Sequence, residues 1–226
     1  MIVERNIQHH RVRVECSEAS SRRAASVLNV FEGLADSGTL LQPGTQIRFG
    51  WSLLNLVEDG SGLRVTEPDF ALWPEPHWKS TIDTTLDILA AQTSLLHHLD
   101  VDGEDAFFDQ VIIASPGALT QPKIFLRHAS RVSAEDSGWL LGTLDDPEAL
   151  NRDNSLETVL IASLVVRRPA LLQALVLPSG FVVLFSGDSL EQIFDSAGSV
   201  RWIEPVVRQQ QRTDHGFQKA KKPCSN

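Results

Sequence analysis

The chain has 226 residues, of which 42% are hydrophobic, and it carries a formal net charge of −9. This length and composition give either one large domain or two small ones with a substantial core, which excludes a mainly disordered protein. The acidic charge opposes binding to nucleic acid, and the two cysteines, Cys16 and Cys224, are not in the C-x-x-C spacing typical of zinc or redox sites.

The N-terminal segment lacks the apolar core of a secretory signal, and no apolar run approaches the roughly 18 residues of a membrane span. The longest apolar runs, such as Phe181 to Phe185, have the size of core elements. The sequence therefore predicts a cytoplasmic protein.

The first half of the chain predicts a small mixed domain over residues 1–118. Apolar and polar residues alternate in the strand patterns, and a spacing of three to four residues marks the helices. The predicted elements are a strand over 1–15, a helix over 20–34, a hairpin of strands 46–57 and 63–66, a helix over 81–98 capped by Ser80, and a strand over 110–114.

The second half predicts another mixed domain over residues 119–205, followed by a disordered basic tail over 206–226. The predicted elements are a strand over 123–127, a tight turn within 127–142, a helix over 155–166 capped by Asn154, a short helix over 170–175, a strand over 181–185 and a helical turn over 190–194. The elements do not alternate regularly between strand and helix. We therefore predict an α+β fold of two small mixed domains, with mainly antiparallel sheets flanked by helices.

The residue patterns give little support for catalysis or for a metal. The histidine pairs His9-His10 and His97-His98 lack the spacing of a ligand site, and the acidic run 100–105 lacks the spacing of a calcium loop. No phosphate-binding loop or nucleophile elbow is present. We therefore predict no catalytic residue, no metal and no cofactor. A small-molecule hydrolase built from carboxylates and His128 remains an alternative.

The segment from Arg127 to Gly142 concentrates charge, a turn signal and an indole. The carboxylate of Asp136 can accept hydrogen bonds from the turn that it begins, and Gly138 allows a positive φ. Trp139 offers a large apolar surface for burial, and Arg127 is placed to pair with Asp136. On physical grounds we favour a role for this motif in the fold over a role in recognition.

These residues also carry a resemblance to a known family. Arg127, the run Asp136-Ser137-Gly138-Trp139, Asn154 before an apolar segment, and the turn Pro178-Ser179-Gly180 occur in the order found in DSGW-motif bacterial immunity proteins. The resemblance covers about residues 120–200. It implies a protein that binds and neutralises a cognate polymorphic toxin or secreted effector, and it makes these motif residues structural markers of the family.

The charge distribution suggests how such a protein would hold its partner. Residues 51–110 contain twelve acidic side chains against Arg64 and Lys79, which gives −10. An acidic surface favours a basic toxin domain and speeds its association. We expect the contacts to come from the carboxylates and indoles that precede the motif, namely Asp100, Asp102, Glu104, Asp105, Trp73 and Trp78. An effector adaptor or chaperone without inhibitory action is a second alternative.

Overall fold

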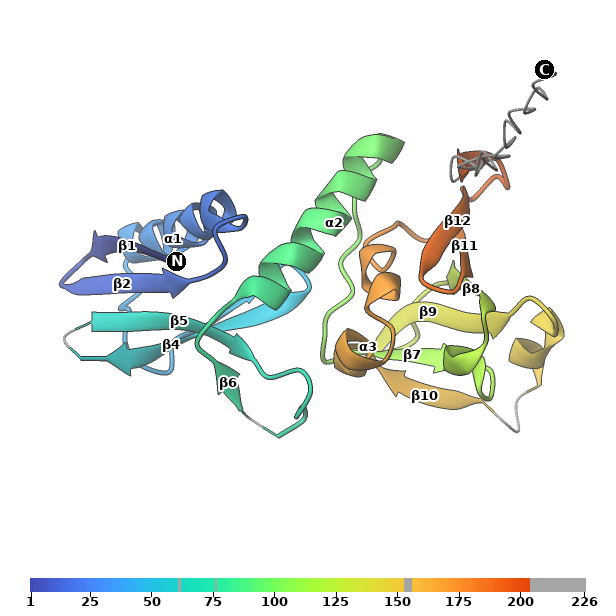
Figure 1. The fold of residues 1–226 in the computed structure, drawn as a ribbon, viewed down its shortest axis with the longest axis horizontal. Helices are drawn as coiled ribbons and strands as arrows, with labels where there is room; N and C mark the ends of the chain where they lie inside the picture. Colours follow the sequence, from blue (N-terminus) through green and yellow to red (C-terminus); the bar gives the residue numbers. More distant parts are fainter. Residues whose placement is uncertain (61, 76, 153–155, 204–226) are drawn as a thin grey trace, which may run out of the picture.

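The computed structural model describes residues 1–60, 62–75, 77–152 and 156–203. These residues form two sheets with three α-helices, so the predicted α+β class is confirmed. Helix α2 runs between the two sheets, and its C-terminal end projects above them (Figure 1). No described helix is long and apolar enough to span a bilayer.

The first sheet contains the strands that precede α2. Its order is β1-β2-β5-β4-β3, with β6 paired to β5, and all pairs are antiparallel except β2 with β5. Helix α1 packs against β1 and β2. The elements are β1 (Ile2–Ile7), β2 (His10–Glu15), α1 (Ser21–Asp36), β3 (Gln46–Phe49), β4 (Ser52–Asp59), β5 (Gly62–Pro68), β6 (Trp78–Lys79) and α2 (Asp83–Leu99).

The second sheet has the order β10-β7-β9-β8-β11-β12-β13, and only β7 and β9 are parallel. Helix α3 and the 3₁₀ turn η3 contact each other, and η3 also contacts α2. The elements are β7 (Val111–Ala114), η1 (Ala118–Thr120), β8 (Lys123–His128), β9 (Asp136–Thr143), η2 (Pro147–Asn151), β10 (Glu157–Leu160), α3 (Ile161–Arg167), η3 (Pro169–Gln173), β11 (Val182–Ser186), β12 (Ser189–Phe194) and β13 (Val200–Ile203).

Helix α2 belongs to both hydrophobic cores. Ile82, just before the helix, and Leu86 in its first turn lie in the core of the first sheet with α1, whereas Leu95 and Leu99 lie in the core of the second sheet. Farther along the helix, Gln92 donates a hydrogen bond to the carbonyl of Leu172 in η3 at 2.9 Å. One helix therefore ties the two sheets together.

The start of α2 is held by a carboxylate from the first sheet. Glu67 of β5 is fully buried, and its two oxygens accept hydrogen bonds from the backbone N–H groups of Thr84 and Thr85 at 3.2 and 2.7 Å. Burial raises the pKa of Glu67 despite these bonds. The predicted cap at Ser80 is wrong, because the helix begins three residues later and takes its cap from a strand distant in sequence.

Two predicted single strands are each divided by a turn. Residues 1–15 form the hairpin of β1 and β2, and Gln8 at its turn has a φ of 54°. The predicted strand 46–57 likewise bends at Gly50, where a φ of 57° reverses the chain between β3 and β4. The predicted hairpin around Asp59 and Gly60 is confirmed by the pairing of β4 with β5.

Of two predicted helical segments in the second half, one is helical only in its second part and the other is a strand. The region 155–166 begins as β10, which pairs with β7, and becomes helical only at Ile161. The β-branched pair Thr158-Val159 suits the sheet edge, so tertiary pairing overrides the helical spacing. Residues 190–194 lie in β12, because the turn at Gly187 closes a hairpin with β11.

The predicted domain division falls near Ala118, but β7 already pairs inside the second sheet. The core against which α2 packs changes between Leu86 and Ile88. We therefore propose that the boundary between the two units lies within α2. The predicted tail 206–226 and the predicted cap Asn154 lie outside the described residues.

Candidate functional site

The run Asp136-Ser137-Gly138-Trp139 forms the first half of β9, where a turn was predicted. The register between β7 and β9 shifts here, which is typical of a bulge. Asp136 accepts a hydrogen bond from the N–H of Gly138 at 2.8 Å and another from the N–H of Val132 at 3.0 Å. The predicted backbone bonds to Asp136 are thus formed, and they fix the entry to the strand.

Gly138 fits its place for two reasons. Its φ is +79°, as predicted, and a Cβ atom there would lie 2.6 Å from the carbonyl oxygen of Ala129 and 3.1 Å from the ring of His128. Only glycine tolerates both the conformation and the close approach. The position is therefore set by packing against β8.

Trp139 and His128 form a buried stack. Their rings lie 4.5 Å apart with an interplanar angle of 11°, and both side chains are at most 1% exposed. Trp139 Nε1 donates to the carbonyl of Leu175 at 3.2 Å, and His128 Nδ1 donates to the carbonyl of Leu177 at 2.7 Å. His128 is therefore a core residue, and this position does not support a hydrolase built around it.

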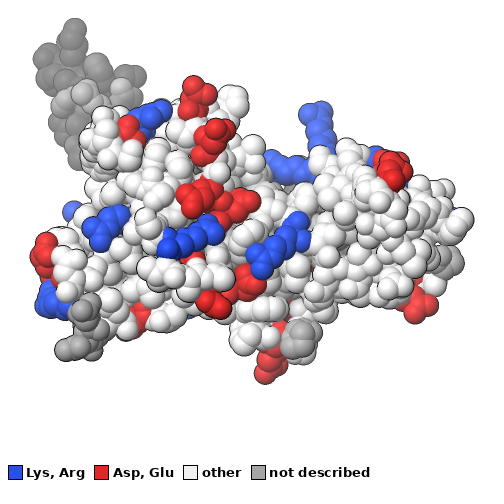
Figure 2. All heavy atoms as spheres, turned by 180° about the vertical axis from the view of Figure 1, so that it is seen from behind, with Lys and Arg blue, Asp and Glu red and all other residues white. Residues whose placement is uncertain are grey.

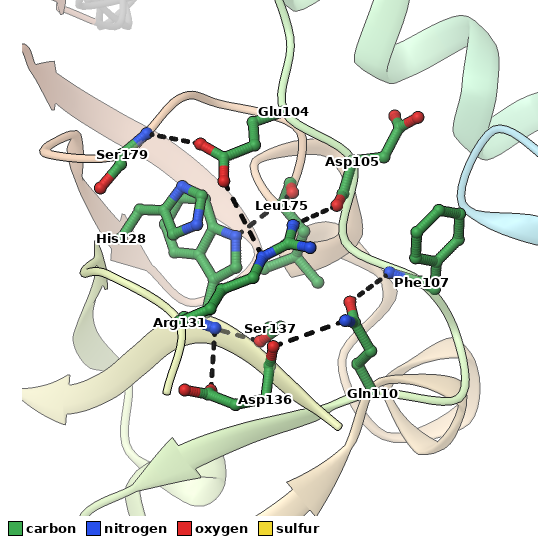
Figure 3. Close-up of polar contacts among 12 residues, drawn as sticks. Glu104, Asp105, Phe107, Gln110, His128, Arg131, Asp136, Ser137, Leu175 and Ser179 are labelled. Atoms are coloured by element: carbon green, nitrogen blue, oxygen red, sulfur yellow. Dashed lines mark hydrogen bonds and ion pairs between the residues drawn. The ribbon is translucent and has the colours of Figure 1, made fainter. Parts of the chain in front are cut away.

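Arg131, rather than Arg127, is the arginine of this region that contacts acidic residues. Arg127 is exposed, and within the described residues its side chain does not pair with Asp136, so that expectation is wrong. The guanidinium of Arg131 donates to the carbonyl of Asp105, and its Nε lies 3.8 Å from a carboxylate oxygen of Glu104 (Figure 3). No spacing in the sequence distinguished Arg131, because its partners lie 26 and 27 positions earlier.

Gln110 and Ser137 complete the connection between the motif and the chain that follows α2. Gln110 accepts a hydrogen bond from the N–H of Phe107 at 2.9 Å (Figure 3). It also donates to the carbonyl of Ala134 at 2.9 Å. Ser137 Oγ donates to the carbonyl of Val111 at 2.6 Å. Sequence analysis missed Gln110, since a glutamine before an apolar strand carries no signal of its own.

The connection after α2, residues 100–105, is called here the acidic linker. Glu104 is engaged, because its second carboxylate oxygen accepts a hydrogen bond from the N–H of Ser179 at 3.2 Å (Figure 3). Asp100, Asp102 and Asp105 are exposed, and their carboxylates make no hydrogen bond or ion pair within the described part of the chain. The structure thus separates the four predicted carboxylates into one that is structural and three that are free.

Most other acidic side chains of residues 51–110 are also engaged. Hydrogen bonds from Arg64 and Arg13 hold the pKa of Asp59 below its usual value. Eight of the twelve acidic side chains contact another group, namely Asp59, Glu67, Asp69, Glu75, Asp83, Asp87, Glu104 and Asp109. Glu58 and the three linker aspartates remain. The acidic side chains without a partner among the described residues are therefore concentrated in the linker. Figure 2 shows acidic and basic groups interleaved over the middle of the face that it displays.

The two predicted indole anchors are less exposed than expected. Trp73 and Trp78 are both half-buried, and the ring of Trp73 lies edge-on to Phe108 at 4.8 Å. Phe108 in turn contacts Phe70, which stacks on Trp51. Trp73 therefore packs at the junction of the two units.

A trough along α2 leads to the acidic linker. One hollow of about 610 Å³ lies between the start of α1, Phe49 and one face of α2, and a second of about 550 Å³ follows α2 to Asp100 and Asp102. The two hollows share Thr93 and His97, so we call them together the α2 trough. Sequence patterns gave no sign of it, because its walls come from α1, β3 and α2.

The site has the chemistry of a binding surface. The described residues contain no cluster of three or more His, Cys, Asp or Glu side chains that could hold a metal. His98 of the predicted pair lies edge-on to Trp202, with ring centroids 4.5 Å apart. The acidic linker and the trough place exposed carboxylates beside a partly apolar depression.

Residues 91–196 match the Imm33-like domain, which characterises a family of immunity proteins. No curated protein and no solved structure matches the chain. The matched segment begins in α2, near the place where that helix passes from one core to the other, and so starts earlier than the expected 120–200. The narrower resemblance to DSGW-motif immunity proteins stays a prediction. The part of the chain that holds the acidic linker and the β9 motif is therefore similar to the Imm33-like domain of immunity proteins.

Proposed function

We propose that the protein is a bacterial immunity protein that binds a cognate toxin or secreted effector and neutralises it by occlusion. The observation that carries the proposal is the position of the three free linker aspartates, Asp100, Asp102 and Asp105, inside the segment that matches the immunity family. Exposed carboxylates that bond to no other described residue are available to a basic partner.

The partner in this proposal is a basic toxin domain, held without a cofactor. Charged groups on an interface raise the rate of association and select the partner by sign. The linker follows the C-terminal end of α2, which projects above both sheets (Figure 1). The indoles Trp73 and Trp78 contribute less than a free anchor would, because they are half-buried.

The test uses the product of the adjacent reading frame as the toxin. We expect the full-length protein to rescue growth of cells that express this product and to co-purify with it. Replacing Asp100, Asp102 and Asp105 by Asn should weaken binding at low salt by about tenfold or more, which corresponds to about 1.4 kcal/mol. The loss should shrink as salt rises, since salt screens exposed charges.

A matched control changes the same number of charges elsewhere. Asp36, Glu58 and Asp145 are exposed and remote in sequence from the linker, and their replacement by Asn or Gln should leave affinity within about twofold. If both triple variants lose the same affinity, the effect comes from net charge alone and the linker is rejected as the contact. Binding without rescue would identify an adaptor instead of an immunity protein.

A further inference from the structure

The two hollows of the α2 trough carry opposite charges. Arg23 of α1 lines the first hollow, is exposed, and makes no hydrogen bond or ion pair with any described residue. Asp100 and Asp102 line the far end of the second hollow and are equally free. The charge along the trough therefore changes from positive in the first hollow to negative in the second.

The middle of the trough changes gradually from apolar to polar. Phe49 and Leu89 line the first hollow together with the side of Leu86, and both Phe49 and Leu89 are half-buried with one side open. Thr93 and His97 follow, shared by both hollows. From Leu86 to Asp100 the helix rises about 21 Å, at about 1.5 Å per residue. This length suits one continuous segment of a partner.

We propose that the trough receives a single segment of the bound toxin whose side chains follow the order carboxylate, bulky apolar group, Lys or Arg. The carboxylate pairs with Arg23, the apolar group enters the hollow between Phe49 and Leu89, and the cation lies at Asp100 and Asp102. The inference rests on the proposed function and adds to it the chemistry and the direction of the contact.

Charge complementarity selects this occupant over the alternatives. A uniformly basic segment would place a cation beside Arg23, and a uniformly acidic one would place a carboxylate beside Asp102; like charges in contact are costly. A segment with no apolar side chain would leave the surface at Phe49 and Leu89 in water, whereas filling such a depression with an anchor typically dominates an interface. The ordered segment alone satisfies all three parts.

The experiment reverses or blocks each part of the trough in the full chain and measures affinity for the adjacent reading-frame product. Arg23→Glu and Asp102→Arg should each weaken binding by about tenfold or more at low salt. Thr93→Trp should weaken it similarly by filling the centre, and because Thr93 is exposed the variant should keep the melting temperature of the parent.

The controls lie beside the tested positions. Arg22→Glu alters the adjacent residue of α1, which is also exposed but does not line the trough, and Glu58→Arg reverses a free charge on β4. Both should bind within about twofold of the parent. If Arg23→Glu or Thr93→Trp leaves binding unchanged while the parent binds, the directed segment is overturned and the immunity proposal stands. If the parent itself does not bind, the proposed function fails first.

Discussion

Arg131, in the loop that leads into the β9 motif, contacts the acidic linker, yet the motif and the linker use their polar groups in opposite ways. In the motif, Asp136, Ser137 and Trp139 all bond to backbone groups of the same chain. In the linker, three of four carboxylates bond to nothing within the described residues. The motif holds the second unit together, and the linker that it positions keeps its charges for another molecule.

The largest test of this contrast is Trp139→Ala. Removing a fully buried indole leaves a cavity and an unpaired carbonyl at Leu175, so the free energy of unfolding should fall by about 3–5 kcal/mol in urea titrations. Trp139→Phe keeps an aromatic ring against His128 and should lose less. Toxin affinity of the folded fraction should not change in either variant. A specific loss of affinity at full stability would make the motif a contact surface.

Gly138→Ala should have the next largest effect. The new methyl group would meet the carbonyl of Ala129 at a φ that alanine disfavours, and the expected loss is about 1–3 kcal/mol. Thermal unfolding measures it, with Gly33→Ala as the control, because a Cβ at Gly33 of α1 meets no atom within 4 Å. A neutral Gly138 variant would show that the bulge at β9 relaxes easily.

The buried carboxylate of Glu67 should make stability depend on pH. Its folded-state pKa is raised, so the folded protein binds the proton more tightly than the unfolded chain. This contribution to stability is present below the unfolded pKa of about 4.3 and is lost as the pH rises through the folded-state value. The difference in unfolding free energy between the parent and Glu67→Gln should therefore shift against the parent as pH increases. A difference that is constant with pH would contradict the raised pKa of Glu67.

The smallest effect on stability belongs to the linker. The Asn variants of Asp100, Asp102 and Asp105 that weaken toxin binding should change the unfolding free energy by no more than about 0.5 kcal/mol, since these carboxylates hold nothing in the fold. Glu104→Gln is the internal comparison, because Glu104 bonds to Ser179 and pairs with Arg131. It should destabilise more than the three aspartate changes together. If the aspartate changes destabilise the protein more than Glu104→Gln, the distinction between a structural Glu104 and three free aspartates is wrong.

The features that the sequence predicted correctly depend on interactions between residues close together in the chain. The Asp-Gly hairpin, helix α1 and the positive φ of Gly138 depend on residues close in the chain, and each is confirmed. What it could not predict depends on pairing at a distance. The apolar spacing around Thr158 and Val159 predicts a helix, but pairing with β7 makes this segment a strand. The cap of α2 is likewise a carboxylate from the distant strand β5.

The candidate site was predictable in part for the same reason. The acidic run is evident in the sequence, where its four carboxylates look equivalent. Only the folded positions of Arg131 and Ser179 distinguish Glu104, which they bind, from the three aspartates. The expected Arg127 pair was wrong because Arg127 lies opposite Leu140 in the pairing of β8 with β9, while the Asp136 carboxylate bonds to backbone N–H groups. The α2 trough needs three elements and leaves no pattern in any one of them.

The shared membership of α2 in two cores has a consequence for exchanging parts between related proteins. Its first turns pack with α1 and its last turns with the second sheet, so both units build the trough. A chimera joined near Ala118 would separate β7 from its own sheet, whereas one joined between Leu86 and Leu95 would keep each sheet intact. Such a chimera would combine the Arg23 hollow of one parent with the Asp102 hollow of the other. We expect it to prefer a partner segment that fits one half of each parent's trough.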